Sequence, residues 1–137
     1  MKILAFVLLG VMSLLGVYAI FSIMIVNPRV VLELETNPEG DRAQKAMLLT
    51  LPSGRTIPVN FLKDDETVYA AADFPWWKEL RNEGGEVHVL IRGQRRSGHG
   101  RAVLDDPGLR TSVFERLRPT APAWTGTLVE IALAPVI

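Results

Sequence analysis

Arginine side chains are the groups in this sequence whose type and spacing best suit chemistry on an anion. A guanidinium presents a planar fork of donors that binds a phosphate or a carboxylate through two hydrogen bonds. Arg55 begins one expected strand, and four further arginines surround an expected hairpin, at Arg92, Arg95, Arg96 and Arg101. The alternative interpretation is a solvated hairpin whose charges serve solubility or contact anionic lipid headgroups.

Two adjacent tryptophans, Trp76 and Trp77, are the second feature that could serve a ligand. They follow Pro75 in a segment, Pro75–Asn82, whose spacing favours a short helix. Neighbouring residues on a helix cannot both face the same way. We therefore expect one indole in the core and the other against a ligand, a membrane interface or a partner surface.

Other catalytic patterns are weak. Ser97, His99 and Asp105 are the residue types of a nucleophilic triad, but no nucleophile-elbow sequence surrounds the serine. His88 and His99 lack the spacing and the nearby acid of a metal site, and the chain has no cysteine. We assign no catalytic residue and no metal site.

The composition is that of an ordinary folded domain. The 137 residues are 48% hydrophobic and 22% charged, with a formal net charge of zero, and this length suits one modest domain. The low net charge and the supply of Val, Leu and Ile exclude a disordered chain. A pI near 6.7 excludes a strongly basic protein that binds nucleic acid.

Residues 1–29 are expected to form an uncleaved transmembrane anchor. No charged residue occurs from Ile3 to Val26, and a helix of this length, at about 1.5 Å per residue, spans a hydrocarbon core of about 30 Å. A cleaved secretory signal is the alternative, but it would have a shorter apolar core and a small-residue cleavage site. The prediction is a single-pass protein of the cell membrane that contacts lipids through this helix, with the folded domain at residues 30–137.

The rest of the chain alternates mostly with a period of two, which is typical of strands. We expect helices at Pro75–Asn82 and from Asp106 to Leu117, and strands at Val30–Glu35, Ala46–Leu51, Arg55–Leu62, Glu66–Ala72, Glu86–Gly93, Gln94–Leu104 and Thr127–Leu133. Pro58 cannot donate to a ladder, so its part of the strand is expected at an edge or a bulge. The fold class is α+β and mainly antiparallel β, as a small barrel or curled sheet.

The stretch from Met47 to Arg118 resembles the deazaflavin-dependent nitroreductase family. The resemblance is carried by five segments, Leu48-Leu49-Thr50, Arg55-Thr56-Ile57-Pro58-Val59, Phe61-Leu62-Lys63-Asp64, Val68-Tyr69-Ala70-Ala71-Ala72 and Pro75-Trp76-Trp77-Lys78-Glu79-Leu80-Arg81-Asn82. It implies a split β-barrel like that of flavin-binding pyridoxamine phosphate oxidases. It also implies a reduced deazaflavin that passes hydride to quinones or nitro compounds.

The same resemblance implies the cofactor-binding residues. The phosphate end would lie at Ser53, Gly54 and Arg55, Trp76 and Trp77 would wall the ring, and Lys78 would add charge nearby. Two departures stand out: the family's Gly-Arg-Lys-Ser-Gly loop is shortened here to Leu51-Pro52-Ser53-Gly54, and Glu79 stands where the family often has Asn. The cofactor is therefore expected to be deazaflavin, with FMN or no cofactor as alternatives.

Two functions follow as hypotheses. The first is a membrane-anchored oxidoreductase that acts on a quinone or nitro acceptor. Its folded domain would be cytoplasmic, because deazaflavin is made and reduced in the cytosol. It would form a homodimer, as flavin-type split barrels often do. The second is a non-catalytic, tethered split-barrel binding or scaffold protein that has lost the cofactor. A discriminating feature is whether Arg55, Lys78 and Arg92 converge on one cleft.

Overall fold

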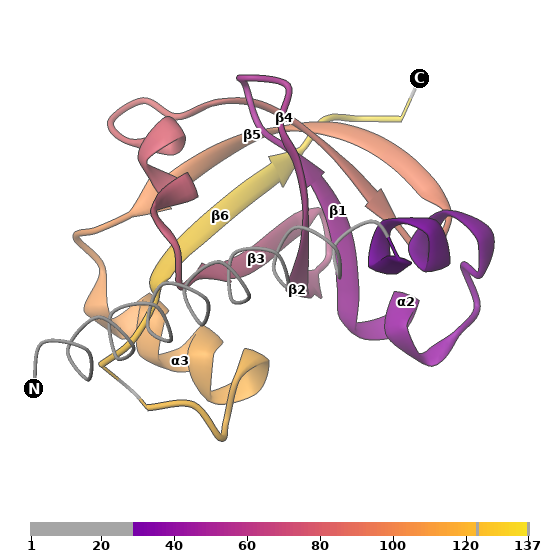
Figure 1. Cartoon of the computed structure of the whole chain (residues 1–137). Helices are drawn as coiled ribbons and strands as arrows, with labels where there is room; N and C mark the ends of the chain where they lie inside the picture. Colours follow the sequence, from indigo (N-terminus) through magenta and orange to yellow (C-terminus); the bar gives the residue numbers. More distant parts are fainter. Residues whose placement is uncertain (1–28, 123, 137) are drawn as a thin grey trace, which may run out of the picture.

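The computed structural model describes residues 29–122 and 124–136. Six strands close into an antiparallel barrel in the order β1-β2-β3-β6-β5-β4 (Figure 1). The strands are β1 (Ala46–Thr50), β2 (Thr56–Asp64), β3 (Thr67–Ala72), β4 (Gly85–Ile91), β5 (Gln94–Val103) and β6 (Thr127–Leu133). The helical segments are residues 29–36, α2 (Asp41–Lys45), the 3-10 helix η1 (Pro75–Leu80) and α3 (Pro107–Leu117).

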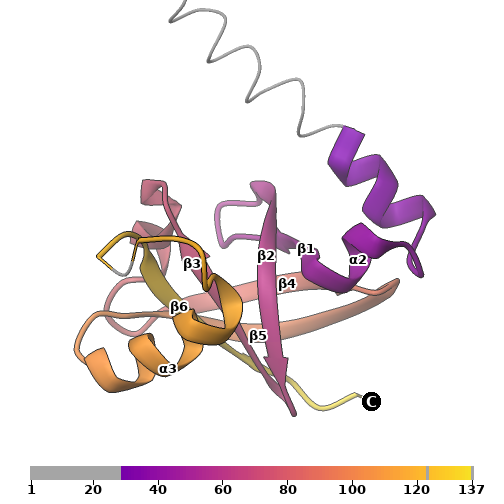
Figure 2. The ribbon, with the colours of Figure 1, turned by 90° about the horizontal axis from the view of Figure 1, so that it is seen from below.

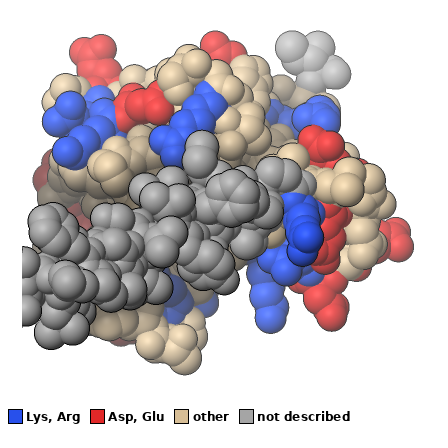
Figure 3. Space-filling view, in the orientation of Figure 1, with Lys and Arg blue, Asp and Glu red and all other residues tan. Residues whose placement is uncertain are grey.

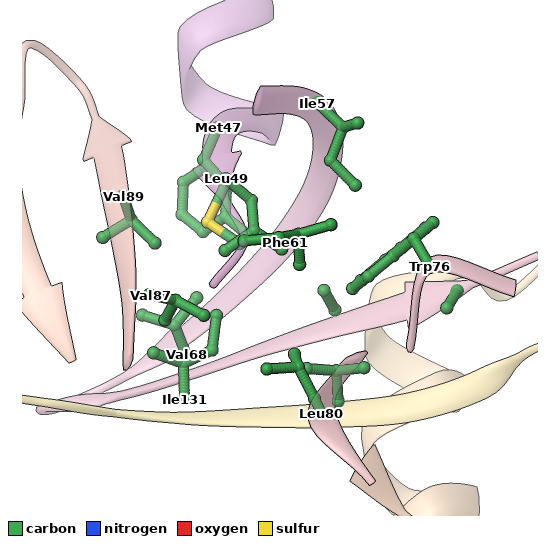
Figure 4. Close-up of a cluster of buried hydrophobic side chains, with 14 of the residues drawn as sticks. Met47, Leu49, Ile57, Phe61, Val68, Trp76, Leu80, Val87, Val89 and Ile131 are labelled. Carbon is green, nitrogen blue, oxygen red and sulfur yellow. The ribbon is translucent and has the colours of Figure 1, made fainter. Parts of the chain in front are cut away.

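The barrel interior is the main hydrophobic core. Alternate residues of the strands point inward, and several of them are completely buried, including Met47, Leu49, Val68, Val87 and Ile131 (Figure 4). Leu80 of η1 is also fully buried and lies against Gly100 of β5, where a Cβ would come within 3.2 Å of a leucine methyl. The short helix η1 therefore packs directly on the backbone of β5 and belongs to this core.

Two smaller clusters cover the outside of the barrel. Residues 29–36 and α2 pack on β1 and β4 through Leu34, Ala43, Leu48 and Leu90. Helix α3 packs through Val113 and Phe114 on Val103 and Leu128. Figure 2 shows β2 running between α3 on one side and α2 on the other.

Strand β2 changes its partner half way along. Thr56–Asn60 pair with Thr50–Ala46 of β1, whereas Phe61–Asp64 pair with Ala70–Thr67 of β3. Among the described residues, the first half of β2 therefore has a ladder partner on one side only. This confirms the prediction that Pro58 lies in an edge segment, because an edge strand leaves room for a residue without an N–H. The barrel is split at this point.

The strands and helices from Ala46 onward agree with the sequence prediction to within one or two residues at most ends. The predicted strand at Val30–Glu35 is wrong, because this segment is helical. The helix places Leu34 in the cluster with Ala43, and Arg42 Nε lies 2.9 Å from Glu33 Oε2. The alternating apolar and acidic residues indicated a strand, but in the helix Leu34, Val30 and Val31 all pack against the cluster formed with α2, β1 and β4.

The predicted location in the cell membrane is corrected here. Across residues 29–122 and 124–136, no helix is both long enough and apolar enough to cross a bilayer. The anchor predicted for residues 1–29 lies outside the described residues except for Arg29. The predicted boundary between residues 29 and 30 is not tested and stays a prediction.

Candidate functional site

A cleft of about 820 Å³ opens where β2 parts from β3. One wall is Ile57–Asn60, in the half of β2 that pairs with β1 but not with β3, and the other is the end of β3 with the segment that leads into η1. Arg42 of α2, Leu117 at the C-terminal end of α3 and Glu79 also line the cleft. A cleft of this volume lies within the range of small-molecule and cofactor sites, about 300–1,000 Å³.

Two of the cationic side chains on the cleft are already paired. Arg42 lies against Glu33, and Arg118 Nη1 donates to Asp73 Oδ1 at 2.8 Å. Arg55 also lines the cleft and is exposed, and no carboxylate of the described residues pairs with its guanidinium. Arg55 is therefore the cation on this cleft that is available to bind an anion.

Backbone hydrogen bonds shape the turn before β2. The Gly54 N–H donates to the Leu51 carbonyl and the Leu51 N–H donates to the Arg55 carbonyl, both at 2.8 Å. Gly54 has a φ of 90°, a conformation that glycine adopts without steric cost. The Ser53 N–H points toward η1 and donates to Glu79 Oε1 at 3.0 Å. One of the donors predicted for a cofactor phosphate is thus engaged by a carboxylate of the same chain.

The two tryptophans take different positions. Trp76 is 7% exposed and is one of the buried side chains drawn in Figure 4. It lines the cleft with Phe74 and Pro75. Trp77 is partly buried against the core and does not line the cleft. Phe74, which is 63% exposed, lies on the cleft and was not among the predicted site residues. The sequence signal that could have identified Phe74 is its position directly before Pro75, the proline that begins η1.

The three cations chosen as a discriminating feature do not converge. Arg55 lies on the cleft, but neither Lys78 nor Arg92 lines it. The Arg92 guanidinium lies over the Phe61 ring, 5.4 Å from its centroid, in the turn between β4 and β5. The site therefore lacks the cluster of positive charges that a coenzyme with several negative charges requires.

The remaining residues singled out in the sequence lie elsewhere. His88, Arg95 and Ser97 line a second cavity of about 360 Å³ on the outside of β1, β4 and β5. Arg96 also lines this cavity, and its guanidinium donates to Glu66. Within residues 29–122 and 124–136, no group of three histidine or carboxylate side chains is placed to hold a metal ion. Figure 3 shows acidic and basic side chains interspersed over the coloured part of one face, so this face carries no large field of one sign.

Comparison with known proteins gives a match to solved structures alone, because no family model and no curated protein matches the chain. A candidate pyridoxamine 5'-phosphate oxidase from Listeria innocua has a TM-score of 0.55 at 17% identity, over 66% of this chain and 85% of that one. The general stress protein 26 of Bacillus anthracis has a TM-score of 0.48 at 21% identity, over 66% of this chain and 80% of that one. An FAD-binding protein from Mesorhizobium loti has a TM-score of 0.46 at 13% identity, over 78% of this chain and 88% of that one.

The likeness to the Listeria protein defines the fold class as a split barrel of the kind found in that candidate pyridoxamine 5'-phosphate oxidase. The likeness to the Listeria protein carries this conclusion, and at 17% identity it shows the fold alone. The predicted split β-barrel is confirmed. The particular family, the deazaflavin-dependent nitroreductases, is not confirmed.

Proposed function

We propose that this protein binds a phosphorylated flavin-type cofactor in the cleft between β2 and β3 and acts with it as a reductase. The single observation that carries the proposal is the unpaired Arg55 guanidinium on an 820 Å³ cleft that also contains Trp76. A flavin needs a flat apolar wall for its ring and a cation for its phosphate, and the cleft offers one of each. The Listeria neighbour is named as a candidate oxidase, but a shared fold does not by itself give a function.

The residues of the cleft fit such a cofactor in part. Trp76, Pro75 and Phe74 form an apolar wall on the η1 side, and Ile57 and Val59 face it from β2. Arg55 stands at the rim beside the turn and would hold the phosphate through its fork. The fit is poorer for a deazaflavin coenzyme with its longer anionic tail, because Lys78 and Arg92 lie off the cleft. Among the cofactors considered, FMN is therefore favoured over deazaflavin.

When bound, the cofactor would supply the hydride chemistry, and the chain would bind, orient and shield it. Trp76 is almost completely buried, so its indole is held rigidly and can define the plane of a ring placed beside it. The exposed Phe74 can cover the ring from the solvent side. The quinone or nitro acceptor and the homodimer remain predictions, as do Ser53, Gly54, Trp77 and Lys78 as cofactor contacts.

A second candidate function is a split-barrel binding protein without redox activity. It is favoured by two observations: the Glu79 carboxylate occupies the Ser53 amide, and Arg55, Lys78 and Arg92 do not converge on one cleft. In this case the cleft would bind a ligand other than a flavin. The two functions make opposite predictions for flavin binding.

The test is a fluorescence titration of the purified full-length chain with FMN and with deazaflavin coenzyme. We expect saturable FMN binding that weakens about tenfold or more in Arg55→Ala, because a charge-assisted hydrogen bond contributes about 1.5–3 kcal/mol. Arg116→Ala is the matched control, since Arg116 is exposed on α3 and does not line the cleft. No binding of either cofactor would overturn the proposal and leave the binding-protein candidate.

A further inference from the structure

Glu79 is the one carboxylate of the cleft that is bound to a backbone amide. Its Oε1 accepts the Ser53 N–H at 3.0 Å, and it forms no ion pair with any cation among the described residues. Asp73, the other acid on the cleft, is neutralised by Arg118. Glu79 therefore carries an uncompensated negative charge at the end of the cleft where Arg55 also lies.

The position that Glu79 occupies is one that an anionic ligand would use. A backbone N–H in a tight turn donates equally to a carboxylate or to a phosphate oxygen. The neighbouring donors of this turn, the N–H groups of Leu51 and Gly54, are used within the turn itself. Ser53 itself does not line the cleft, whereas the Glu79 carboxylate that covers its amide does. A phosphate that enters from the cleft thus meets a like charge first and finds the amide behind it taken.

We propose that Glu79 sets the charge selectivity of the cleft by holding the place of a ligand phosphate at the Ser53 amide. The inference uses the cleft of the proposed function but depends only on the contact between Glu79 and Ser53. Arg55 and Glu79 then act in opposition, because one attracts an anionic end group and the other excludes it from the turn. The cleft of the natural sequence discriminates weakly between neutral and phosphorylated ligands with the same ring.

The test is a titration of ¹⁵N-labelled full-length chain with inorganic phosphate, followed at the Ser53 amide resonance. Glu79→Gln removes the charge, and Glu79→Ala also removes the acceptor. We expect both variants to show a phosphate-dependent shift of the Ser53 amide with a midpoint at least about tenfold lower than in the natural sequence. Glu83→Gln is the control, because Glu83 is an exposed acid close in sequence that does not line the cleft, and its midpoint should equal that of the natural sequence.

Equal midpoints for the natural sequence and both Glu79 variants would overturn the inference, as would a Ser53 amide that phosphate does not move in Glu79→Ala. A parallel titration separates this result from the proposed function. Riboflavin and FMN share a ring and differ by the phosphate, so Glu79→Gln should raise the preference for FMN over riboflavin about tenfold. If neither flavin binds to any variant, the proposed function fails, while the phosphate titration still decides the role of Glu79.

Discussion

At the scale of single residues, Arg96 joins three parts of the chain at one end of the barrel. Its Nη2 donates to Glu66 Oε2 at 2.5 Å and to the Ala134 carbonyl at 2.8 Å, and its side chain is only 14% exposed. The hydrogen bond from Arg96 lowers the pKa of Glu66 below its usual value, with a further contribution from the charge of Lys63. Arg96 thus stabilises the fold, although the sequence analysis grouped it with arginines that could bind an anion.

The Glu66 carboxylate gives the protein a specific acid sensitivity. Because the pKa of Glu66 is lowered on folding, its contribution to stability is present above the ordinary glutamate pKa of about 4.3 and is lost as the pH falls through the folded value. We expect Glu66→Gln to flatten the dependence of stability on pH below about pH 4.3, measured by urea denaturation. Glu115→Gln, an exposed acid on α3, should keep the slope of the natural sequence. Parallel curves for Glu66→Gln and the natural sequence would contradict the assignment.

Gly84 and Gly54 provide a matched pair of positions with a positive φ. Gly84 has a φ of 76°, and a Cβ there would come within 2.0 Å of the Gly100 carbonyl oxygen. Gly54 has a φ of 90° but open space around it. We expect Gly54→Ala to cost about 1–2 kcal/mol, from backbone strain alone, and Gly84→Ala to cost several kcal/mol because β4 must move away from β5. Thermal unfolding of both variants measures the difference, and equal losses would contradict this packing.

At the scale of elements, α3 begins at a side-chain cap. Asp106 Oδ1 accepts the Leu109 N–H at 3.0 Å, and Pro107 follows in the first turn. Asp106→Ala should therefore lower the free energy of unfolding by about 1 kcal/mol, as measured by chemical denaturation. Asp105→Ala is the matched control, because Asp105 is an exposed acid one residue earlier that caps nothing. A similar loss in both variants would show that charge near the helix end matters and the cap does not.

The elements from Ala46 onward could be predicted from the sequence because each has a local signal. The structure has the strands predicted from the alternation in Glu86–Gly93 and Thr127–Leu133, and it has the helix α3 predicted from its Asp-Pro start. The strand prediction for residues 30–35 failed because the alternation of apolar and acidic residues is equally compatible with a helix once Leu34 has a packing partner. That partner is supplied by Ala43, Leu48 and Leu90, which are distant in sequence or on another element.

At the scale of the whole molecule, the cleft arises from pairings that no local pattern encodes. It exists because β2 pairs with β3 only from Phe61 to Asp64, and because β3 continues alongside β6 to Ala72. The sequence indicated Arg55 and Trp76 as site residues, and both lie on this cleft. It could not indicate that Lys78 and Arg92 would lie off it, because their distance from Arg55 is set by the closure of the barrel. Phe74 and Arg118 reach the cleft for the same reason.

The distribution of charge over the molecule limits the ligand class. Most cations near the cleft are neutralised within the chain, as Arg118 is by Asp73. A single free guanidinium can hold one phosphate group but cannot compensate a long anionic tail. The fold is a split barrel. Under the proposed function, the charges of the cleft favour the smaller members of the flavin cofactors.

The most direct test of the central claim, that the cleft between β2 and β3 is a flavin site, is a crystal structure of the full-length chain grown with FMN. The proposal predicts the isoalloxazine ring between Trp76 and the Ile57–Asn60 half of β2, with its phosphate within hydrogen-bonding distance of the Arg55 guanidinium. Density for FMN at the outer cavity beside His88 and Arg95 would contradict it. An empty cleft at saturating FMN would do the same.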